Sequence, residues 1–387
     1  MRILHFADVH LGYRAYNRVT EQGINQREAD VFKTFEFALE AMADLQPDLV
    51  LMAGDLFHVV RPSNLVIHHA FRRLQRFAEK VKCPVVMIAG NHESPRSADA
   101  GCILSLYSNI SGIITEDLRF SSVRIDKLDL QVVCVPHRGL RRFDETPPTP
   151  DPSARYNILM LHGTLQGIQS GFYDTYFVPR EVIRRENWDY IALGHYHKFT
   201  KIWDNAFYSG SLEYTSPNFW EELDSPKGFI EYDLENRKLV NFHQVEPLRE
   251  FVMLGSIDAE GLSASEVDGK ITAALGRVKG GVAGKVVRLV VENIPRDVQR
   301  DLDHKALRAA RAEALHFDLV FVPPKRRRLE PLSSEGLDGS RHTLEQDWSE
   351  YVDSYSLPKG VDREELKQLG LQYLSRVTEA SDAADIP

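Results

Sequence analysis

Five short apolar runs of the sequence each end in a cluster of polar residues, and this recurrence constrains the fold more than any other feature. The five segments are FADVH, AGDLFH, AGNHE, LMLHG and LGHYH. Helical patterns separate the first three runs, as in an α/β sheet whose strands are covered on both faces. Such sheets bind ligands at the carboxyl ends of their strands. The sequence therefore predicts one polar site assembled from several strand ends.

The chain up to residue 90 is predicted to alternate between strands and helices. Val31, Phe35 and Met42 belong to a set of apolar residues at three- and four-residue intervals, which indicates a helix with one buried face. A second helix is expected over 64–80, with Ser63 as its N-cap. The strands expected around these helices are 3–6, 48–53 and 85–89.

From residue 120 the pattern changes to strands with little helix between them. This change favours a second sheet, mixed or antiparallel, that stacks on the first. The strands expected in this region are 120–125, 130–135, 157–161, 190–193, 228–233 and 238–245.

Pattern and composition divide the chain into four predicted parts. Residues 1–248 hold the sheets, and residues 249–324 form a small α+β domain. Residues 325–341 are a polar linker, and residues 342–387 hold two helical patterns. Because this last pair of helices cannot bury its apolar face alone, it is a candidate partner-binding element, and packing back onto its own chain is the alternative. The apolar positions are Leu344, Trp348, Tyr351, Val352 and Tyr355, and then Leu366, Leu369, Leu371, Tyr373 and Leu374.

Composition restricts the class of protein. A chain of 387 residues suits two or three domains, and a hydrophobic content of 43% excludes global disorder. No apolar run approaches the ~18 residues that would span a bilayer, and no signal-peptide pattern is present. We therefore expect a cytoplasmic protein that does not contact a membrane.

Cysteine content and net charge add weaker constraints. The three cysteines lack CxxC spacing, which argues against a disulfide framework and a thiolate zinc site and favours buried, reduced thiols. The formal net charge of −9, taken alone, argues against a nucleic-acid partner. Metal-site carboxylates and acidic tails give the same total while local basic patches remain, so net charge does not decide the partner.

The polar clusters supply oxygen and imidazole ligands without a thiolate, a set suited to manganese, iron or zinc. Side chains two apart on a strand point the same way, so Asp8 and His10 can hold one ion. The pair His195 and His197 can do likewise. Adjacent Asn91 and His92 should diverge, leaving one on the metal and one facing the substrate. The candidate metal ligands are Asp8, His10, Asp55, Asn91, His162, His195 and His197.

Each candidate ligand also has a purely structural interpretation. Asp8 and Asp55 are typical of turns and helix entries, and Asn91 is typical of a left-handed turn. His162 fits a hydrogen-bonded core position. Independent turn residues have no reason to form one ordered set, so the complete set favours a metal site.

Taken in order, Asp-x-His, Gly-Asp, Gly-Asn-His-Glu, His and Gly-His-x-His resemble the signature of the calcineurin-like metallophosphoesterases. Within that superfamily, DVHLG at 8–12 and GDLFH at 54–58 resemble the SbcD family of nuclease subunits. The motif resemblance covers roughly residues 1–245. It implies a four-layer α-β-β-α sandwich, which would be followed by a small α+β DNA-capping domain and C-terminal helices that dock a partner ATPase.

The same resemblance implies two divalent metal ions, with manganese expected. Asp8, His10 and His197 would hold the first ion. Asn91, His162 and His195 would hold the second, and Asp55 would bridge the two.

Two further histidines correspond to active-site residues of the family. His92 would protonate the leaving oxygen or stabilise the transition state, and His58 would lie beside the phosphate. Glu93 stands where many members carry Asp, although Gly-Asn-His-Glu also occurs in the superfamily.

The function implied is a manganese-dependent DNA exonuclease and endonuclease for double-strand-break repair. It would work as a homodimer with an SbcC-type SMC-like ATPase, bound through the C-terminal helices. Another two-metal phosphoesterase, a phosphatase or a cyclic-nucleotide phosphodiesterase, is the alternative, and the roughly 140 residues after residue 248 count against it. A non-catalytic scaffold is a third interpretation, and the complete ligand set counts against it.

A basic segment, RGLRR at 138–142, follows a predicted strand end in the catalytic part. It could meet a phosphate backbone there, and a solvated face is the alternative. The predicted DNA-contacting residues are Arg138, Arg141 and Arg142.

Overall fold

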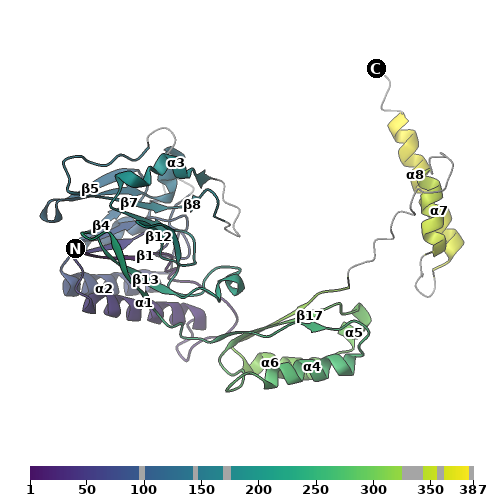
Figure 1. Ribbon diagram of the computed structural model, residues 1–387. Helices are drawn as coiled ribbons and strands as arrows, with labels where there is room; N and C mark the ends of the chain where they lie inside the picture. The colour runs from purple at the N-terminus through teal and green to yellow at the C-terminus, as the bar shows by residue number, and fades with distance from the viewer. Residues whose placement is uncertain (96–100, 143–146, 169–175, 325–342, 355–360, 383–387) are drawn as a thin grey trace. The chain divides into compact units, whose positions relative to one another are not determined.

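Two six-stranded sheets form the frame of the amino-terminal part of the chain (Figure 1). The computed structural model describes residues 1–95, 101–142, 147–168, 176–324, 343–354 and 361–382. It divides the chain into two compact units, Met1–Pro324 and Lys325–Pro387.

The first sheet has the strand order β14-β13-β1-β2-β3-β4. Strands β1 to β4 are parallel, whereas β13 pairs antiparallel with β1, and β14 pairs antiparallel with β13. The prediction that 228–233 and 238–245 belong to the second sheet is therefore wrong. An apolar pattern predicts a strand but does not identify its partner, and here the partner is the first strand of the chain. The bounds are β1 Arg2–Phe6, β2 Leu49–Met52, β3 Val85–Ile88, β4 Ile113–Glu116, β13 Gly228–Asp233 and β14 Lys238–Gln244.

The second sheet is mixed, as predicted, with the order β11-β12-β10-β7-β6-β5. Its four central strands are parallel, and the edge strands β5 and β11 run antiparallel to their neighbours. The bounds are β5 Ser121–Ile125, β6 Leu130–Val135, β7 Tyr156–His162, β10 Tyr190–Gly194, β11 Thr200–Trp203 and β12 Ala206–Tyr208. A short ribbon of β8 (Thr164–Leu165) and β9 (Phe177–Val178) follows β7.

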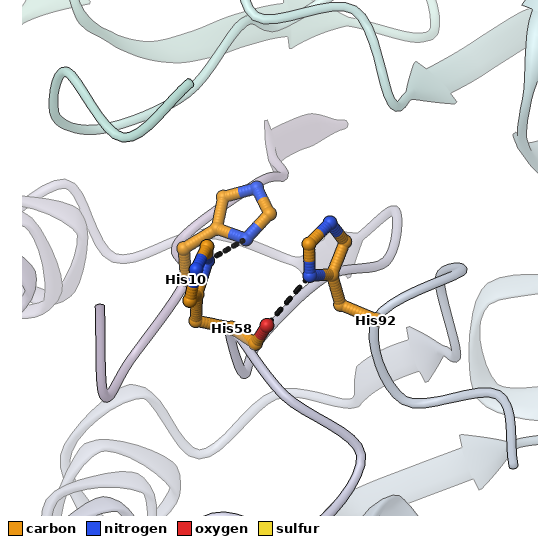
Figure 2. A group of neighbouring side chains, drawn as sticks. All are labelled: His10, His58 and His92. Atoms are coloured by element: carbon orange, nitrogen blue, oxygen red, sulfur yellow. Dashed lines mark hydrogen bonds between the residues drawn. The ribbon is translucent and has the colours of Figure 1, made fainter. Parts of the chain in front are cut away.

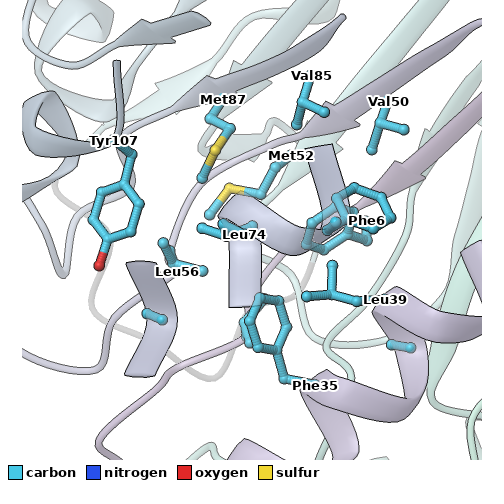
Figure 3. Close-up of a cluster of buried hydrophobic side chains, with 14 of the residues drawn as sticks. Phe6, Phe35, Leu39, Val50, Met52, Leu56, Leu74, Val85, Met87 and Tyr107 are labelled. Carbon is cyan, nitrogen blue, oxygen red and sulfur yellow. The ribbon is translucent and has the colours of Figure 1, made fainter. Parts of the chain in front are cut away.

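The central strands β2 and β3 of the first sheet are apolar throughout because both faces of the sheet are covered there. In β2, Leu51 faces the second sheet, whereas Val50 faces the helices α1 (Gln26–Asp44) and α2 (Asn64–Val81). Figure 3 shows the helix-side core, where Phe35 of α1 and Leu74 of α2 approach the strands.

Helix caps and the outer layer complete the sandwich. Ser63 caps α2 as predicted, and its hydroxyl accepts a hydrogen bond from the backbone N–H of Val66 at 3.3 Å. On the outer face of the second sheet, Trp188 and the four-residue helix α3 (Arg180–Ile183) cover the strands. The predicted α-β-β-α layer order is therefore confirmed, with a thin fourth layer.

The rest of the first unit forms a small sheet with helices and a core of its own. All of its strand pairings are parallel, and helices form the connections from β16 to β17 and from β17 to β18. The bidentate pair of Arg249 with Asp30 at 2.9 Å and the stacked rings of Tyr16 and His316 join it to the larger sheets. The bounds are β15 Phe251–Met253, β16 Ile257–Asp258, α4 Ala264–Gly276, β17 Val286–Glu292, α5 Arg296–Arg300, α6 His304–Glu313 and β18 His316–Phe321.

The second unit contains the two predicted C-terminal helices, α7 (Leu344–Ser354) and α8 (Arg363–Asp382), which pack on each other. The indole N–H of Trp348 donates to the carbonyl of Lys367 at 3.0 Å. A Cβ at Gly370 would lie 2.1 Å from the Trp348 ring, so this approach requires glycine. The predicted linker and Tyr355 lie outside the described residues.

Two predictions from composition can be compared with the fold. Cys83, Cys102 and Cys134 are buried and unpaired, as expected of reduced thiols. Within the described ranges, no helix combines the length and the apolar character that a membrane crossing requires.

Replacing Phe35 with Ala is expected to destabilise the fold by about 3–5 kcal/mol, because the ring is fully buried against the first sheet. Phe37 lies on the same helix and is 44% exposed, so Phe37→Ala is the matched control and should change stability little. Urea unfolding followed by circular dichroism measures both variants. Equal losses would show that the α1 face is assigned wrongly.

Candidate metal centre

The loops after β1, β2, β3, β7 and β10 converge at one edge of the sandwich. Two groups of side chains with ligand atoms within 4.8 Å of one another lie there. Each group draws on both sheets, so the carboxyl ends of the two sets of parallel strands meet. The groups are Asp8, His10 and His197, and Asp55, His162 and His195.

In the first group, the Nε2 atoms of His10 and His197 are 3.0 Å apart. Asp8 is fully buried beside them, and its two carboxylate oxygens accept the backbone N–H of His195 at 3.0 Å each. Asp8 therefore also fixes the start of the loop that carries His197.

The second group surrounds the side-chain oxygen of Asn91. Asn91 Oδ1 lies 3.0 Å from His162 Nε2 and 2.8 Å from His195 Nδ1. Asp55 of the second group also approaches the first group, since its Oδ2 is 3.3 Å from His162 Nε2 and 3.8 Å from His10 Nε2. All seven predicted ligands thus lie close together at this edge of the sandwich.

The prediction that alternation along a strand directs these side chains is wrong. Strand β1 ends at Phe6, and Asp8 and His10 both lie beyond it with left-handed backbone, at φ 54° and 55°. His195 also has a positive φ, of 98°, and it belongs to a different group from His197. Loop backbone that the sheets hold in place, rather than the alternation of a strand, directs these side chains.

The hydrogen bonds of His162 identify its ligand atom. Its Nδ1 lies 2.8 Å from the carbonyl of Ala53, which can only accept, so Nδ1 carries the hydrogen. The lone pair of Nε2 then faces Asn91 Oδ1, which is also an acceptor. A cation between the two atoms resolves this conflict, and a ring N–H donated to a backbone carbonyl is usual for metal-binding histidines.

Charge at the site also suits a cation. Burial raises the pKa of Asp8, and the nearby carboxylate of Asp55 raises it further. Burial lowers the pKa of His10, which favours the neutral imidazole that binds metals. Carboxylate, amide and neutral imidazole donors without a thiolate therefore fit divalent metal ions.

His10 of the first group also lies close to His58 and His92 (Figure 2). The Nδ1 of His92 donates to the carbonyl of His58 at 2.6 Å, and the two rings stack at a centroid distance of 5.2 Å. His58 Nδ1 lies 3.5 Å from His10 Nδ1. Since Nδ1 of His92 holds its hydrogen on a carbonyl, Nε2 is the atom of that ring that can accept or deliver a proton.

Comparison with known proteins agrees with this geometry. Residues 1–199 match the family model described as calcineurin-like phosphoesterase, which is just over half of the chain. The chain belongs to the calcineurin-like phosphoesterase family. The predictions of the superfamily and of a phosphoester-hydrolysing enzyme are thereby confirmed.

Curated relatives of this phosphoesterase include proteins of DNA repair. It is 29% identical over 300 residues to the DNA double-strand break repair protein Mre11 of Methanocaldococcus jannaschii, which covers 74% of this chain and 77% of that protein. It is 27% identical over 285 residues to the SbcD subunit of the SbcCD nuclease of Staphylococcus epidermidis, which covers 66% of this chain and 72% of that protein. The match to the Mre11 protein of Methanopyrus kandleri spans 57% of that relative, at 29% identity and over 64% of this chain. The predicted resemblance to the SbcD family is confirmed by these relatives.

Glu93 has a role in the phosphoesterase that the motif alone does not reveal. Its buried carboxylate accepts the backbone N–H groups of Asp55 at 3.1 Å, Gly90 at 2.9 Å and Phe57. These bonds join the loop after β2 to the loop after β3. Glu93 therefore positions both loops rather than facing the substrate.

His137 also lies at the site and was not predicted from the sequence. The ring of His137 lies 6.1 Å from that of His195 and 6.2 Å from that of His162, measured between centroids. Its place just after the end of β6 is the signal that could have identified it. A cavity of about 390 Å³ beside His58 is lined by Arg14 and Arg61 among others.

The predicted DNA-contacting arginines belong to a 3-10 helix, His137–Arg142. Arg138 is half-buried and donates to the carbonyl of Pro95 at 3.3 Å. The side chains of Arg141 and Arg142 lie outside the described part of the chain. Their contact with DNA stays a prediction.

Replacing Gly90 with Ala is expected to weaken metal binding by at least about tenfold, the usual loss when a supporting contact of a metal ligand is broken. A Cβ at Gly90 would lie 2.0 Å from Asp55 Oδ1, so the carboxylate must move. Isothermal titration with Mn²⁺ measures the change. In the control Gly269→Ala, a Cβ would meet no atom within 4 Å. Unchanged affinity in Gly90→Ala would exclude Asp55 as a ligand in this position.

Proposed function

We propose that this chain is a two-metal nuclease that hydrolyses phosphodiester bonds of DNA in double-strand-break repair. The observation that carries the proposal is the convergence of seven oxygen and imidazole donors from five strand ends. The choice of DNA is supported by the names of the relatives, a DNA double-strand break repair protein and a nuclease subunit.

Two divalent ions, which we propose to be Mn²⁺, would be held as the grouping suggests. Asp8, His10 and His197 are the proposed ligands of the first ion, and Asn91, His162 and His195 those of the second. Asp55 is the proposed bridge, because its Oδ2 lies near histidines of both groups. When bound, such ions lower the pKa of a water ligand and neutralise phosphate oxygens.

The proton needed by the leaving oxygen would come from His92. Its Nδ1 stays bonded to the carbonyl of His58, so the ring presents Nε2 toward a substrate in one fixed orientation. An imidazole suits this role because its ordinary pKa lies near neutral pH. His58 stacks on the ring and limits its rotation, which supports a place for His58 beside the phosphate.

Replacing His92 with Ala is expected to leave Mn²⁺ binding intact and to lower DNA cleavage by about 10²–10⁴-fold, the usual contribution of a general acid. Cleavage of linear double-stranded DNA is measured with Mn²⁺, Mg²⁺ or a chelator. His243 pairs with Glu231 near the edge of the first sheet, so His243→Ala is the control. Loss of metal binding together with cleavage would contradict the assigned role.

The same assay separates the nuclease from a small-molecule phosphoesterase. Mn²⁺-dependent loss of DNA supports the nuclease. No DNA cleavage together with rapid hydrolysis of a simple phosphodiester would replace it with a phosphatase or cyclic-nucleotide phosphodiesterase.

We propose that the C-terminal helices α7 and α8 dock an SbcC-type SMC-like ATPase. The similarity to a subunit of the SbcCD nuclease supports this proposal. Although α7 and α8 pack on each other, apolar side chains stay exposed, including Tyr351 at 51%, Leu369 at 51% and Tyr373 at 61%. Leu369 and Tyr373 are four residues apart on α8 and therefore share one face. An exposed apolar helix face is a common docking element.

The double variant Leu369→Asp and Tyr373→Asp is expected to weaken ATPase binding by at least about tenfold, because buried aromatic and aliphatic anchors dominate such interfaces. Gln372 is exposed on the same helix, and Gln372→Asp is the matched control. Biolayer interferometry with the ATPase measures affinity, and DNA cleavage by the isolated chain should not change. Binding equal to that of the control would exclude this face.

Three further parts of the proposal concern assembly and DNA contact. Residues 249–324 are proposed to cover bound DNA, and Arg138, Arg141 and Arg142 to contact its backbone. A homodimer is proposed through a groove of about 410 Å³ between α1 and α2, which Phe32 and Leu65 line. Light scattering of the purified chain tests the dimer. A cytoplasmic location stays a prediction.

A further inference from the structure

A fully buried lysine lies directly behind the first ligand group. The Nζ atom of Lys227 donates to the backbone carbonyl of His197 at 2.9 Å, to Ser211 Oγ at 2.8 Å and to Glu222 Oε2 at 2.6 Å. An ammonium group has three hydrogens, so these acceptors satisfy it completely. Burying a lysine is costly without such partners, and one of the three belongs to a proposed metal ligand.

The other oxygen of Glu222 approaches the ring of the same histidine. Glu222 Oε1 lies 3.7 Å from Nδ1 of His197, whereas Nε2 of that ring faces Nε2 of His10 at 3.0 Å. One ring nitrogen thus points into the ligand group and the other toward a carboxylate. The separation is longer than a hydrogen bond, so Glu222 acts on this ring through its negative charge, which favours a hydrogen on Nδ1 and leaves Nε2 as the ligand nitrogen.

The backbone around His197 depends on the same contacts. His197 follows the end of β10 and belongs to no helix or strand. Its carbonyl also accepts the backbone N–H of Ser211 at 3.2 Å. Since Lys227 and Ser211 both donate to this carbonyl, they fix the main-chain position from which the ring projects.

We propose that Glu222 and Lys227 are positioning residues for His197. Together they hold its ring and backbone so that the group of Asp8, His10 and His197 binds its metal ion tightly. The group of Asn91, His162 and His195 is arranged around a different atom, Asn91 Oδ1, and keeps its own ion when the pair is altered. The inference rests on the metal centre of the proposed function.

Binding of Mn²⁺ to the full chain tests this inference without reference to catalysis. The variants are Glu222→Gln, which keeps the shape and removes the charge, and Lys227→Met, which removes the ammonium. Lys198 pairs with the exposed Asp224 at 3.0 Å and is next to His197 in the sequence. Lys198→Met is therefore the matched control for losing a lysine nearby.

We expect the wild-type chain to bind two Mn²⁺ ions. Binding is measured by isothermal titration calorimetry and by electron paramagnetic resonance. Both positioning variants should weaken one ion by about 10–100-fold, the usual effect of losing a residue that orients a metal ligand. In these two variants the other ion should bind as in the wild type. In the control Lys198→Met, both ions should bind as in the wild type. Circular dichroism establishes that each variant is folded, and Glu222→Gln decides the test if Lys227→Met does not fold.

Two results in the variants and one in the wild-type chain would overturn the inference. Wild-type binding of both ions in Glu222→Gln would exclude a positioning role, and equal weakening of both ions would indicate general loosening of the fold. If the wild-type chain binds two ions but does not cut DNA, the nuclease proposal is wrong. The Mn²⁺-binding test of the variants still decides the inference in that case. A wild-type chain that binds no Mn²⁺ would overturn both.

Discussion

The buried carboxylate of Asp55 is the point on which the rest of the site depends. Its Oδ1 accepts the backbone N–H of His92 at 2.9 Å, and its own N–H is bound by Glu93. Its carbonyl accepts the N–H of His10 at 3.0 Å, which ties the loop after β1 to the loop after β2. Burial opposes the charged form of Asp55, but the neighbouring His162 and His10 hold its pKa well below the ordinary value, so a charged carboxylate lies at the centre of the site.

The sheets make this arrangement possible in conformational terms. Asp8, His10 and Asp55 all have left-handed backbone, which costs about 1–3 kcal/mol for a residue held in a sparsely populated region. Each lies just beyond a buried parallel strand, whose hydrogen bonds and packing fix the entry to the loop. A rigid frame therefore holds strained loops, and the ligand atoms stay in place without the reorganisation that a flexible site would need.

The metal centre is also connected physically to the small sheet that follows it. The ammonium of Lys227 lies 4.8 Å from the ring of Tyr214, whose carbonyl accepts a hydrogen bond from buried Arg27. Arg27 lies beside Asp30, which forms the bidentate pair with Arg249 just before β15. A continuous path of charged and aromatic contacts thus runs from behind His197 to the start of residues 249–324. These contacts join the site to the small sheet, which keeps a hydrophobic core of its own.

Local chemistry allowed much of this protein to be predicted from its sequence. Apolar runs indicated the strands, Ser63 marked the start of α2, and the polar clusters indicated the seven residues that the fold brings together, because each of these signals lies within a few residues. The tertiary structure alone decided what depends on distant partners. It placed β13 against β1 and β14 against β13, separated His195 from His197, and gave Glu93 and Lys227 their donors and acceptors. Strand partners, left-handed loop backbone and buried hydrogen bonds are fixed by contacts between residues far apart in the chain, and no local pattern encodes them.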